Sequence, residues 1–260
     1  MGEVCAMKVR IRFRKYGSMK YVGHLDLMRY FQKAIRMSEI DICYSEGFSP
    51  HQMMSFASPL GVGLTSDGEY LDLEVHTSRS SKESMAALNA VMPEGMEITG
   101  YVRLDDHAKT AMSVVSAADY EIWFQKEAVV PEKMKDFERL KELLQEFLSK
   151  PERMLVRKKT KKSEKVMDLK PLVYDFRVLE PQERFFHRPA FYLDVCTGSM
   201  DNVKPELVLV AFFGYLDLEY DPYALQIHRK DVYFTDVDGK RKTLLQAGAE
   251  MTDFGEERID

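Results

Sequence analysis

Four side chains that could transfer protons lie in two short stretches near the N-terminus. His24 and Asp26 fall in GHLDLMR, and Glu46 and His51 fall in SEGFSPH. Histidine titrates near neutral pH, and a carboxylate partner would raise its pKa, so these residues are candidates for general acid–base catalysis. No activated nucleophile accompanies them. Catalysis, ligand binding and a purely structural turn therefore all remain open for these two motifs.

The first motif opens a predicted helix over residues 25–37. Apolar residues recur at three- and four-residue spacings and should face a sheet: Leu25, Leu27, Met28, Phe31, Ala34 and Ile35. Asp26, Arg29, Lys33 and Arg36 should then form an outward stripe, and its cations Arg29, Lys33 and Arg36 are candidate residues for binding RNA. His24 lies at the helix start, where free backbone N–H groups can hold an anion, so it could touch a phosphate or simply complete a helix cap.

The second motif is a loop that follows a predicted strand over residues 40–44. Gly47 permits a positive φ and Pro50 fixes a turn, so the loop should be stiff. Stiff polar loops are common places for binding groups. We therefore take Gly47, Phe48, Pro50 and His51 as candidate binding residues.

A cationic strand precedes both motifs. Alternation over residues 8–14 places Val9, Ile11 and Phe13 on one face and Lys8, Arg10, Arg12 and Arg14 on the other. Four like charges on one face require nearby acids, solvent or an anionic ligand. The predicted strand over residues 69–75 could supply acids through Asp72 and Glu74. An RNA or phosphate surface made by Arg10, Arg12 and Arg14 is the alternative.

The order of predicted elements indicates an α+β fold with two ferredoxin-like (split βαβ) halves in tandem. Strand 8–14, helix 25–37, strands 40–44 and 69–75, helix 82–91 and strand 96–104 complete the first domain, residues 1–116. A second, elaborated domain over residues 117–235 contains strands at 120–124, 154–158, 172–179, 191–195 and 226–234, and helices at 131–148 and 205–215. Residues 236–260 are expected to be a frayed polar tail.

Composition restricts the class of partner. The 260 residues carry a net charge of −5, which argues against indiscriminate coating of nucleic acid. Basic residues nevertheless concentrate in residues 1–66 and 150–170, which include a predicted basic hairpin tip at residues 159–163. In the second half Lys170, Arg177 and Arg229 are candidate binding cations, with Asp175 and Asp194 as possible internal partners.

Cysteine content and hydropathy bear on cofactors and location. The three cysteines are widely spaced, so neither a disulfide framework nor a metal motif is expected. No apolar run reaches the roughly 20 residues needed to span a bilayer, and the start lacks a signal-peptide pattern. We expect a cytoplasmic protein without a membrane partner, a bound metal or a cofactor of its own.

Three stretches together closely resemble the radical SAM-associated protein family: KVRIRFRKYGSMKYVGHLDLMRYFQKAIR, SEGFSPHQMMSFASPLGVG and EYLDLEV. This family is a domain of unknown function, found separate from or fused to the C-terminus of cobalamin-binding radical SAM proteins. Positions that fit its pattern are Gly23, His24, Asp26, Arg29, Gly47, Phe48, Pro50 and His51. Gln52 stands where a second proline is usual, which bears on the stiffness of the loop.

The resemblance implies a partner that does the chemistry. This chain lacks the CxxxCxxC that binds an iron–sulfur cluster, so SAM and the cluster would belong to a radical SAM enzyme, one that often binds cobalamin. The expected function is an accessory or substrate-binding protein that presents RNA. Two alternatives remain: a stand-alone RNA-modifying or hydrolytic enzyme that uses His24, Asp26, Glu46 and His51, and a protein–protein adaptor that does not bind nucleic acid.

Overall fold

The computed structural model describes residues 6–159, 164–198 and 201–252, without the side chains of residues 151, 153, 157–159, 164 and 165. The fold is α+β, as predicted. The chain forms two compact units: unit 1 runs to Val115 and resumes at Asp231, and unit 2 covers residues 116–230. The chain therefore passes between the units twice, at the start of β5 (Val115–Phe124) and within β10 (Leu225–Thr235).

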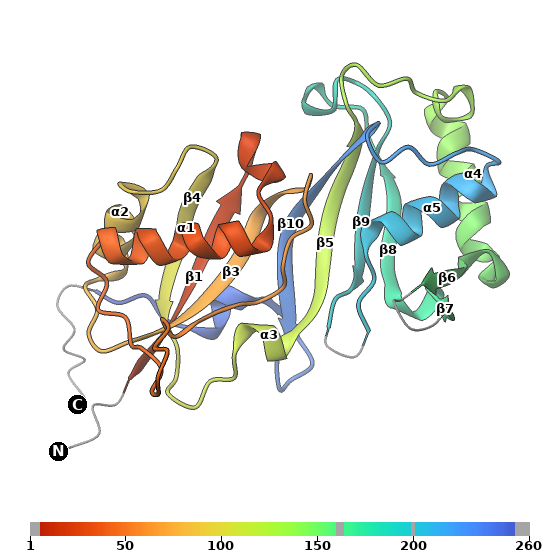
Figure 1. Ribbon diagram of the computed structural model, residues 1–260. Coiled ribbons are helices and arrows are strands. Elements are labelled where there is room, and N and C mark those ends of the chain that lie inside the picture. Colours follow the sequence, from red (N-terminus) through yellow and green to blue (C-terminus); the bar gives the residue numbers. More distant parts are fainter. Residues whose placement is uncertain (1–5, 160–163, 199–200, 253–260) are drawn as a thin grey trace. The chain divides into compact units, whose positions relative to one another are not determined.

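Unit 1 contains a mainly antiparallel sheet with the strand order β4-β1-β3. In chain order its elements are β1 (Met7–Lys15), α1 (His24–Met37), β2 (Met54–Phe56), β3 (Thr65–Val75), α2 (Ser81–Asn89) and β4 (Met96–Arg103). The short β2 pairs with the other edge of β3. This order is compatible with a split βαβ arrangement. Figure 1 shows α1 lying across these strands.

The predicted strand over residues 40–44 is wrong. Only Ile42 and Tyr44 form isolated β-bridges there, to Val75 and Gln52, and the strand that pairs with β3 is β2 instead. Both apolar residues pack in the core: Ile42 belongs to the hydrophobic cluster of unit 1, and Ile40 packs against that cluster.

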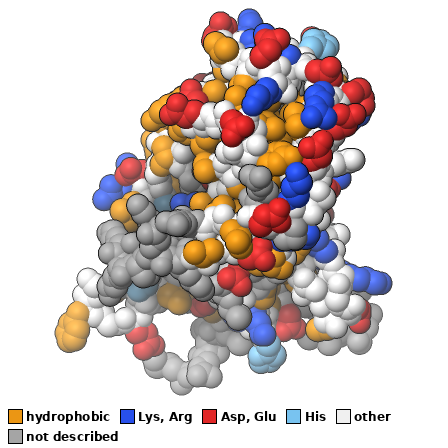
Figure 2. Space-filling view, turned by 90° about the vertical axis from the view of Figure 1, so that its right-hand side faces the viewer, with side chains coloured by type: hydrophobic (Ala, Val, Ile, Leu, Met, Phe, Trp, Pro, Cys, Tyr) orange, Lys and Arg blue, Asp and Glu red, His pale blue; other side chains and the backbone are white. Residues whose placement is uncertain are grey.

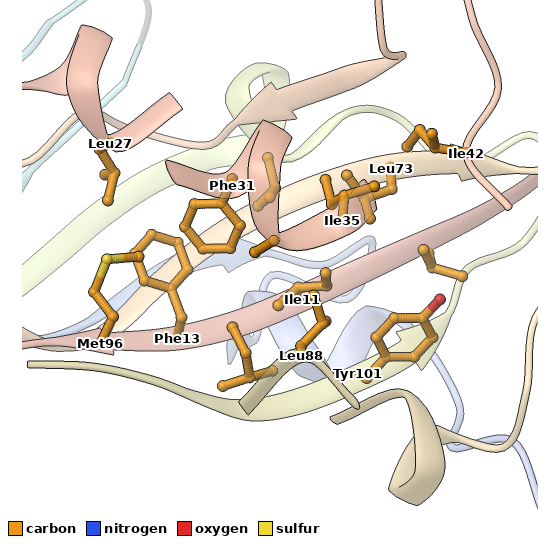
Figure 3. Packing of buried hydrophobic residues seen from close by; sticks show 14 of the residues in the cluster. Ile11, Phe13, Leu27, Phe31, Ile35, Ile42, Leu73, Leu88, Met96 and Tyr101 are labelled. Atoms are coloured by element: carbon orange, nitrogen blue, oxygen red, sulfur yellow. The ribbon is translucent and has the colours of Figure 1, made fainter. Parts of the chain in front are cut away.

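The core of unit 1 lies between the sheet and its helices. Val9, Ile11 and Phe13 of β1 are fully buried, as the alternation predicts. Phe31 of α1 meets Phe13 edge to face, with 4.7 Å between ring centroids (Figure 3). Leu25 is an exception to the predicted face, because its side chain is 65% exposed. It lies about 200° around the helix from the buried Leu27, and so faces away from the sheet.

Unit 2 has the strand order β10-β5-β9-β8. Its other main elements are α4 (Phe137–Ser149), β8 (Val173–Leu179), β9 (Ala190–Cys196) and α5 (Pro205–Tyr215). The predicted strand over residues 154–158 does not join this order: β6 (Leu155–Lys159) and β7 (Glu164–Asp168) form a separate two-stranded hairpin. Most of the predicted basic tip at residues 159–163 lies outside the described residues. The helix expected from Pro131 begins at Phe137, where the Asp136 side chain accepts from the backbone of Arg139.

The segment from Asp236 to Thr252 is ordered structure rather than the predicted frayed tail. β11 (Arg241–Thr243) pairs with β10, and a 3₁₀ turn, η6 (Leu244–Ala247), follows it. Leu244 is fully buried, and the backbone of Ala249 exchanges two hydrogen bonds with Arg103. Buried apolar contacts and backbone pairing together hold this segment in unit 1.

Asp231 of β10 is bound closely to β1 and β3. Its carboxylate accepts hydrogen bonds from the Tyr70 hydroxyl at 2.7 Å and from Arg12 Nη2 at 2.8 Å. Burial raises the pKa of Asp231, although Arg12 and Tyr70 act in the opposite direction. Gly68 faces the same residue, and a Cβ at Gly68 would lie only 2.6 Å from Asp231 Oδ1 and 2.7 Å from its Cα. Only glycine therefore allows β3 to pass this close to Asp231.

Replacing Gly68 with alanine should destabilise unit 1. The added Cβ must push β3 away from Asp231, and we expect a loss of about 2 kcal/mol in the free energy of unfolding. Urea denaturation monitored by circular dichroism would measure it. Gly214→Ala is the matched control, since no atom lies within 4 Å of its Cβ position. Equal stability of both variants would show that Gly68 does not limit this approach.

Candidate functional site

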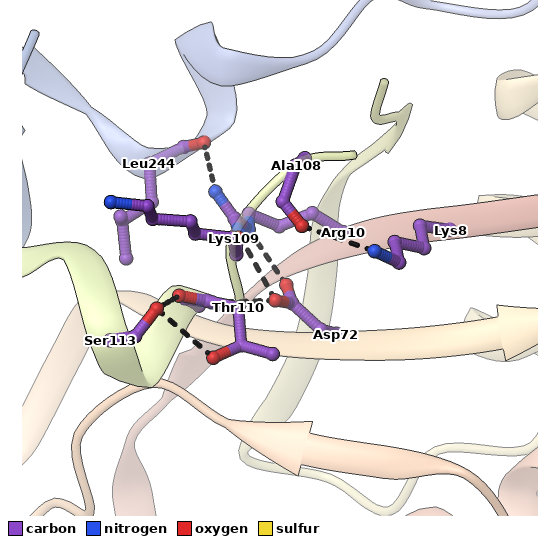
Figure 4. A network of polar contacts seen from close by, with 9 residues as sticks. Lys8, Arg10, Asp72, Ala108, Lys109, Thr110, Ser113 and Leu244 are labelled. Atoms are coloured by element: carbon purple, nitrogen blue, oxygen red, sulfur yellow. Dashed lines mark hydrogen bonds and ion pairs between the residues drawn. The ribbon is translucent and has the colours of Figure 1, made fainter. Parts of the chain in front are cut away.

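Arg10, the first arginine of the predicted RNA surface, is buried and internally paired. Its side chain is 1% exposed, and it donates to both oxygens of Asp72, from Nε at 2.7 Å and from Nη2 at 3.0 Å (Figure 4). Arg10 Nη1 also donates to the Leu244 carbonyl at 3.1 Å. The Ala111 N–H donates to Asp72 Oδ2 at 2.6 Å. Arg10 therefore has internal partners for its charge, and an RNA contact at this residue would require breaking those bonds.

Arg12 and Arg14 also have acidic partners. Arg12 pairs with Asp231, and Arg14 Nε donates to Asp67 Oδ1 at 2.7 Å. Arg14 Nη1 lies 3.2 Å from Glu97, and these acids raise the pKa of Arg14. Of the two acids that the sequence predicts as partners, Asp72 and Glu74, only Asp72 pairs with an arginine of β1 in the described residues. Arg14 remains 42% exposed, but its charge is already matched by two carboxylates.

The outward stripe of α1 is exposed as predicted. Arg29, Lys33 and Arg36 all lie on the surface, and Arg29 donates to Asp26 at 2.9 Å in an exposed pair. Such a pair is weak and can exchange for another anion. Lys33 and Arg36 complete the stripe at i+4 and i+7 from Arg29, so the three cations share one side of the helix.

The SEGFSPH loop is closed by hydrogen bonds around His51. The Ser45 hydroxyl lies 2.7 Å from His51 Nδ1 and accepts from the His51 backbone N–H at 3.1 Å. The Ser45 N–H donates to the His51 carbonyl at 2.9 Å. Gly47 has φ of 106°, which the loop requires, and Phe48 is fully exposed at the tip, beside the exposed Pro50. The expected stiffness of the loop therefore has a physical basis.

The loop base contacts α1. Gln52 Nε2 lies 3.4 Å from the carbonyl oxygen of Gln32. Gln32 lies between Arg29 and Arg36, at three and four residues from them, so it adjoins the cationic stripe. The segment that follows SEGFSPH therefore contacts the helix that begins within GHLDLMR.

No hydrogen bond or ion pair joins the four acid–base candidates to one another in the described residues. His24 is half-buried at the start of α1, its ring lies edge-on to Phe56 with 5.1 Å between ring centroids, and its buried Nδ1 has no hydrogen-bond partner among the described residues. Glu46 is exposed, and His51 is paired with Ser45 instead. In the described part of the chain neither histidine hydrogen bonds with a carboxylate. Within residues 6–159, 164–198 and 201–252, no group of three or more His, Cys, Asp or Glu is placed to hold a metal ion.

The predicted cations of unit 2 are dispersed. Lys170 is exposed. Arg177 pairs with Asp175, and its guanidinium carbon lies 4.2 Å from the centroid of the Tyr192 ring. Arg229 is only 4% exposed and lies over the Tyr120 ring. Figure 2 looks from the right-hand side of Figure 1, where α4 lies, and shows acidic and basic side chains interspersed. The described side chains in this view form no continuous basic surface. In the described residues no helix is long and apolar enough to cross a membrane.

The structure contains a cysteine–histidine contact that the sequence did not indicate. Cys43 Sγ lies 3.5 Å from His76 Nδ1, which resembles the geometry of an activated thiol. Burial, Glu74 and Asp41 all raise the pKa of Cys43, so the thiol is protonated and shielded. The two residues are 33 positions apart, so only their pairing in the fold could reveal the contact.

Cys43 should therefore be unreactive in the folded protein. In a Cys5→Ser background, we expect iodoacetamide to modify the half-exposed Cys196 at least about tenfold faster than Cys43 at neutral pH. Peptide mass spectrometry over a time course would measure both rates. Faster modification of Cys43 would instead show that His76 activates it.

Breaking the buried pair of β1 should cost far more than breaking the exposed pair of α1. Arg10→Ala leaves Asp72 buried without its cation, and we expect a loss of about 3–5 kcal/mol in the free energy of unfolding. Arg29→Ala, the control, should cost less than about 1 kcal/mol. Urea denaturation would compare them. The double variant Arg10→Met/Asp72→Leu should recover part of the loss, and no recovery would contradict a pairwise origin.

Comparison with known proteins places the chain in a family. No curated protein matches it. A family model described as "Uncharacterized protein conserved in bacteria (DUF2344)" matches residues 8–205, which is more than half of the chain and includes β1, α1, the SEGFSPH loop and most of unit 2. The chain therefore belongs to this uncharacterized bacterial family.

Proposed function

We propose that the protein is an accessory protein that binds RNA and presents it to a radical SAM enzyme. The link to such an enzyme rests on the resemblance of GHLDLMR and SEGFSPH to the radical SAM-associated family. SAM, the iron–sulfur cluster and, where present, cobalamin belong to the partner in this proposal. The present chain supplies binding and orientation, in the cytoplasm.

One observation carries the RNA part of the proposal: exposed cations and an exposed aromatic ring lie on adjoining segments. Arg29, Lys33 and Arg36 of α1 can contact phosphates, and Gln52, which follows the loop that carries Phe48, hydrogen bonds with Gln32 of that helix. Proteins that bind single-stranded nucleic acid combine these two features, because cations follow the backbone and aromatic rings stack on bases. His51 is an exposed residue of the same loop.

The proposal moves the RNA contact away from β1. Arg10, Arg12 and Arg14 already have carboxylate partners, so binding RNA there would require breaking those pairs. Among the described residues, Arg29 is the one of the three α1 cations that forms an ion pair, with the exposed Asp26, and this pair costs little to displace. Phosphate contacts are therefore assigned to α1.

A protein–protein adaptor is the second candidate. Phe48 is fully exposed and Tyr44 is half-exposed, and aromatic side chains of this kind are common anchors at protein interfaces. An adaptor would bind the radical SAM enzyme through the loop and would keep that binding after nuclease treatment. It would also tolerate charge reversal on α1.

RNA bound in cells should depend on the α1 cations. After cross-linking and purification, we expect wild type to carry a discrete RNA and Arg29→Glu/Lys33→Glu/Arg36→Glu to lose most of it, because three phosphate contacts become repulsive. Sequencing and quantification of the retained RNA would measure this. Circular dichroism would confirm equal folding.

The matched control is Lys135→Glu/Arg139→Glu/Lys141→Glu, which makes the same change of charge on exposed residues of unit 2. It should retain the RNA. Equal loss in both variants would show only a net-charge effect and would overturn an RNA surface on α1. Absence of RNA from wild type, together with nuclease-resistant binding to the enzyme, would favour the adaptor.

A further inference from the structure

We propose that two copies of this chain associate through β8, which pairs with itself across a two-fold axis and extends the sheet of unit 2. β8 is the last strand in the order β10-β5-β9-β8, and among the described strands it pairs with β9 alone (Figure 1). The outer edge of such a strand presents backbone N–H and C=O groups with which another strand can pair. This inference goes beyond the proposed function, since β8 takes no part in the RNA surface on α1.

The two faces of β8 differ in chemistry. Phe176 is only 4% exposed, and its ring centroid lies 5.6 Å from that of Phe212 in α5, so a helix covers this face. Asp175 and Arg177 lie on either side of Phe176 in the strand, and their side chains therefore point to the opposite face. Their side chains are 36% and 57% exposed. The charged face of β8 is thus accessible to a second copy.

The middle of β8 is complementary to itself in the antiparallel direction. The strand reads VYDFRVL, and a two-fold axis at Phe176 places Asp175 of each copy directly opposite Arg177 of the other. Residues directly opposite in antiparallel strands share a face, with Cβ atoms about 5 Å apart, which is within reach of an ion pair. All three residues belong to the regular part of the strand, because its register shift lies between Val173 and Asp175.

Charge selects this register from the neighbouring ones. An axis at Asp175 would place two aspartates directly opposite each other, and an axis at Arg177 would do the same with two arginines. Like charges directly opposite destabilise a pair of strands. A register changed by one residue would join the helix-covered face of one copy to the charged face of the other, because side chains alternate between faces. The axis at Phe176 avoids both conflicts.

The ion pair that already exists within each copy does not prevent this association. Arg177 pairs with Asp175 of its own strand, but both side chains are partly exposed, and such pairs contribute little to stability. A guanidinium group has five N–H donors and a carboxylate accepts several hydrogen bonds, so each charge can bind a second partner. Across the axis the two copies would then form one cluster of two arginines and two aspartates.

Sedimentation velocity of the nuclease-treated full chain tests the association. We expect wild type to form dimers, and Asp175→Arg or Arg177→Asp alone to dimerise at least about tenfold more weakly, because each places like charges opposite each other twice. An equimolar mixture of the two variants should recover the dimer, since one copy then carries two arginines and the other two aspartates. Both variants lose the pair within their own strand, so recovery in the mixture reports pairing between copies.

Glu39→Arg in unit 1 is the matched control, because it makes the same change of charge in an exposed pair, with Arg79, and it should remain dimeric. Circular dichroism would confirm equal folding of all variants. A wild-type monomer at about 100 μM would overturn the association. Undiminished dimers of either single variant would overturn the assignment to β8, and a monomeric mixture would overturn the register. The α1 charge-reversal variant should still dimerise, so this inference and the RNA proposal fail separately.

Discussion

The buried ion pair between Arg10 and Asp72 is the interaction on which unit 1 depends. It joins β1 to β3, and through the Leu244 carbonyl and the Ala111 N–H it also fixes η6 and the segment before β5. The Arg10 side chain is only 1% exposed. Its guanidinium charge needs partners in the protein, because removing that charge from water would otherwise raise the free energy of the folded state. The pair thus explains why segments distant in sequence form one unit.

This pairing also determines which surfaces remain for binding. The acids matched to β1 occupy the polar face of the sheet, so that face is not an open cationic strip. On the opposite side, α1 buries its apolar residues against the core and exposes its cations to solvent. The segment that follows SEGFSPH contacts α1 there, through the Gln52–Gln32 hydrogen bond.

Local patterns were sufficient for several elements but not for others. The alternation of β1 and the spacing of α1 predicted both elements and the buried Val9, Ile11 and Phe31. Leu25 was misplaced because one apolar residue in a first turn has no neighbour to define its face. The segment at residues 40–44 resembled a strand, yet β2 took the place beside β3. The ordered residues up to Thr252 looked like a polar tail, because their partners, such as Arg103, lie far away in sequence.

The sequence by itself determined that the N-terminal third carries a cationic strand, an amphipathic helix and a stiff loop, since alternation, spacing, glycine and proline act over a few residues. Only the tertiary structure decided whether those cations were available. Arg14 pairs with Asp67, which is 53 residues away in the sequence, and Arg12 pairs with Asp231, which is 219 residues away. Strand register sets such pairings, and register depends on the packing of the whole unit. The sequence therefore predicted the positive charges of β1, but it did not predict which carboxylates pair with them.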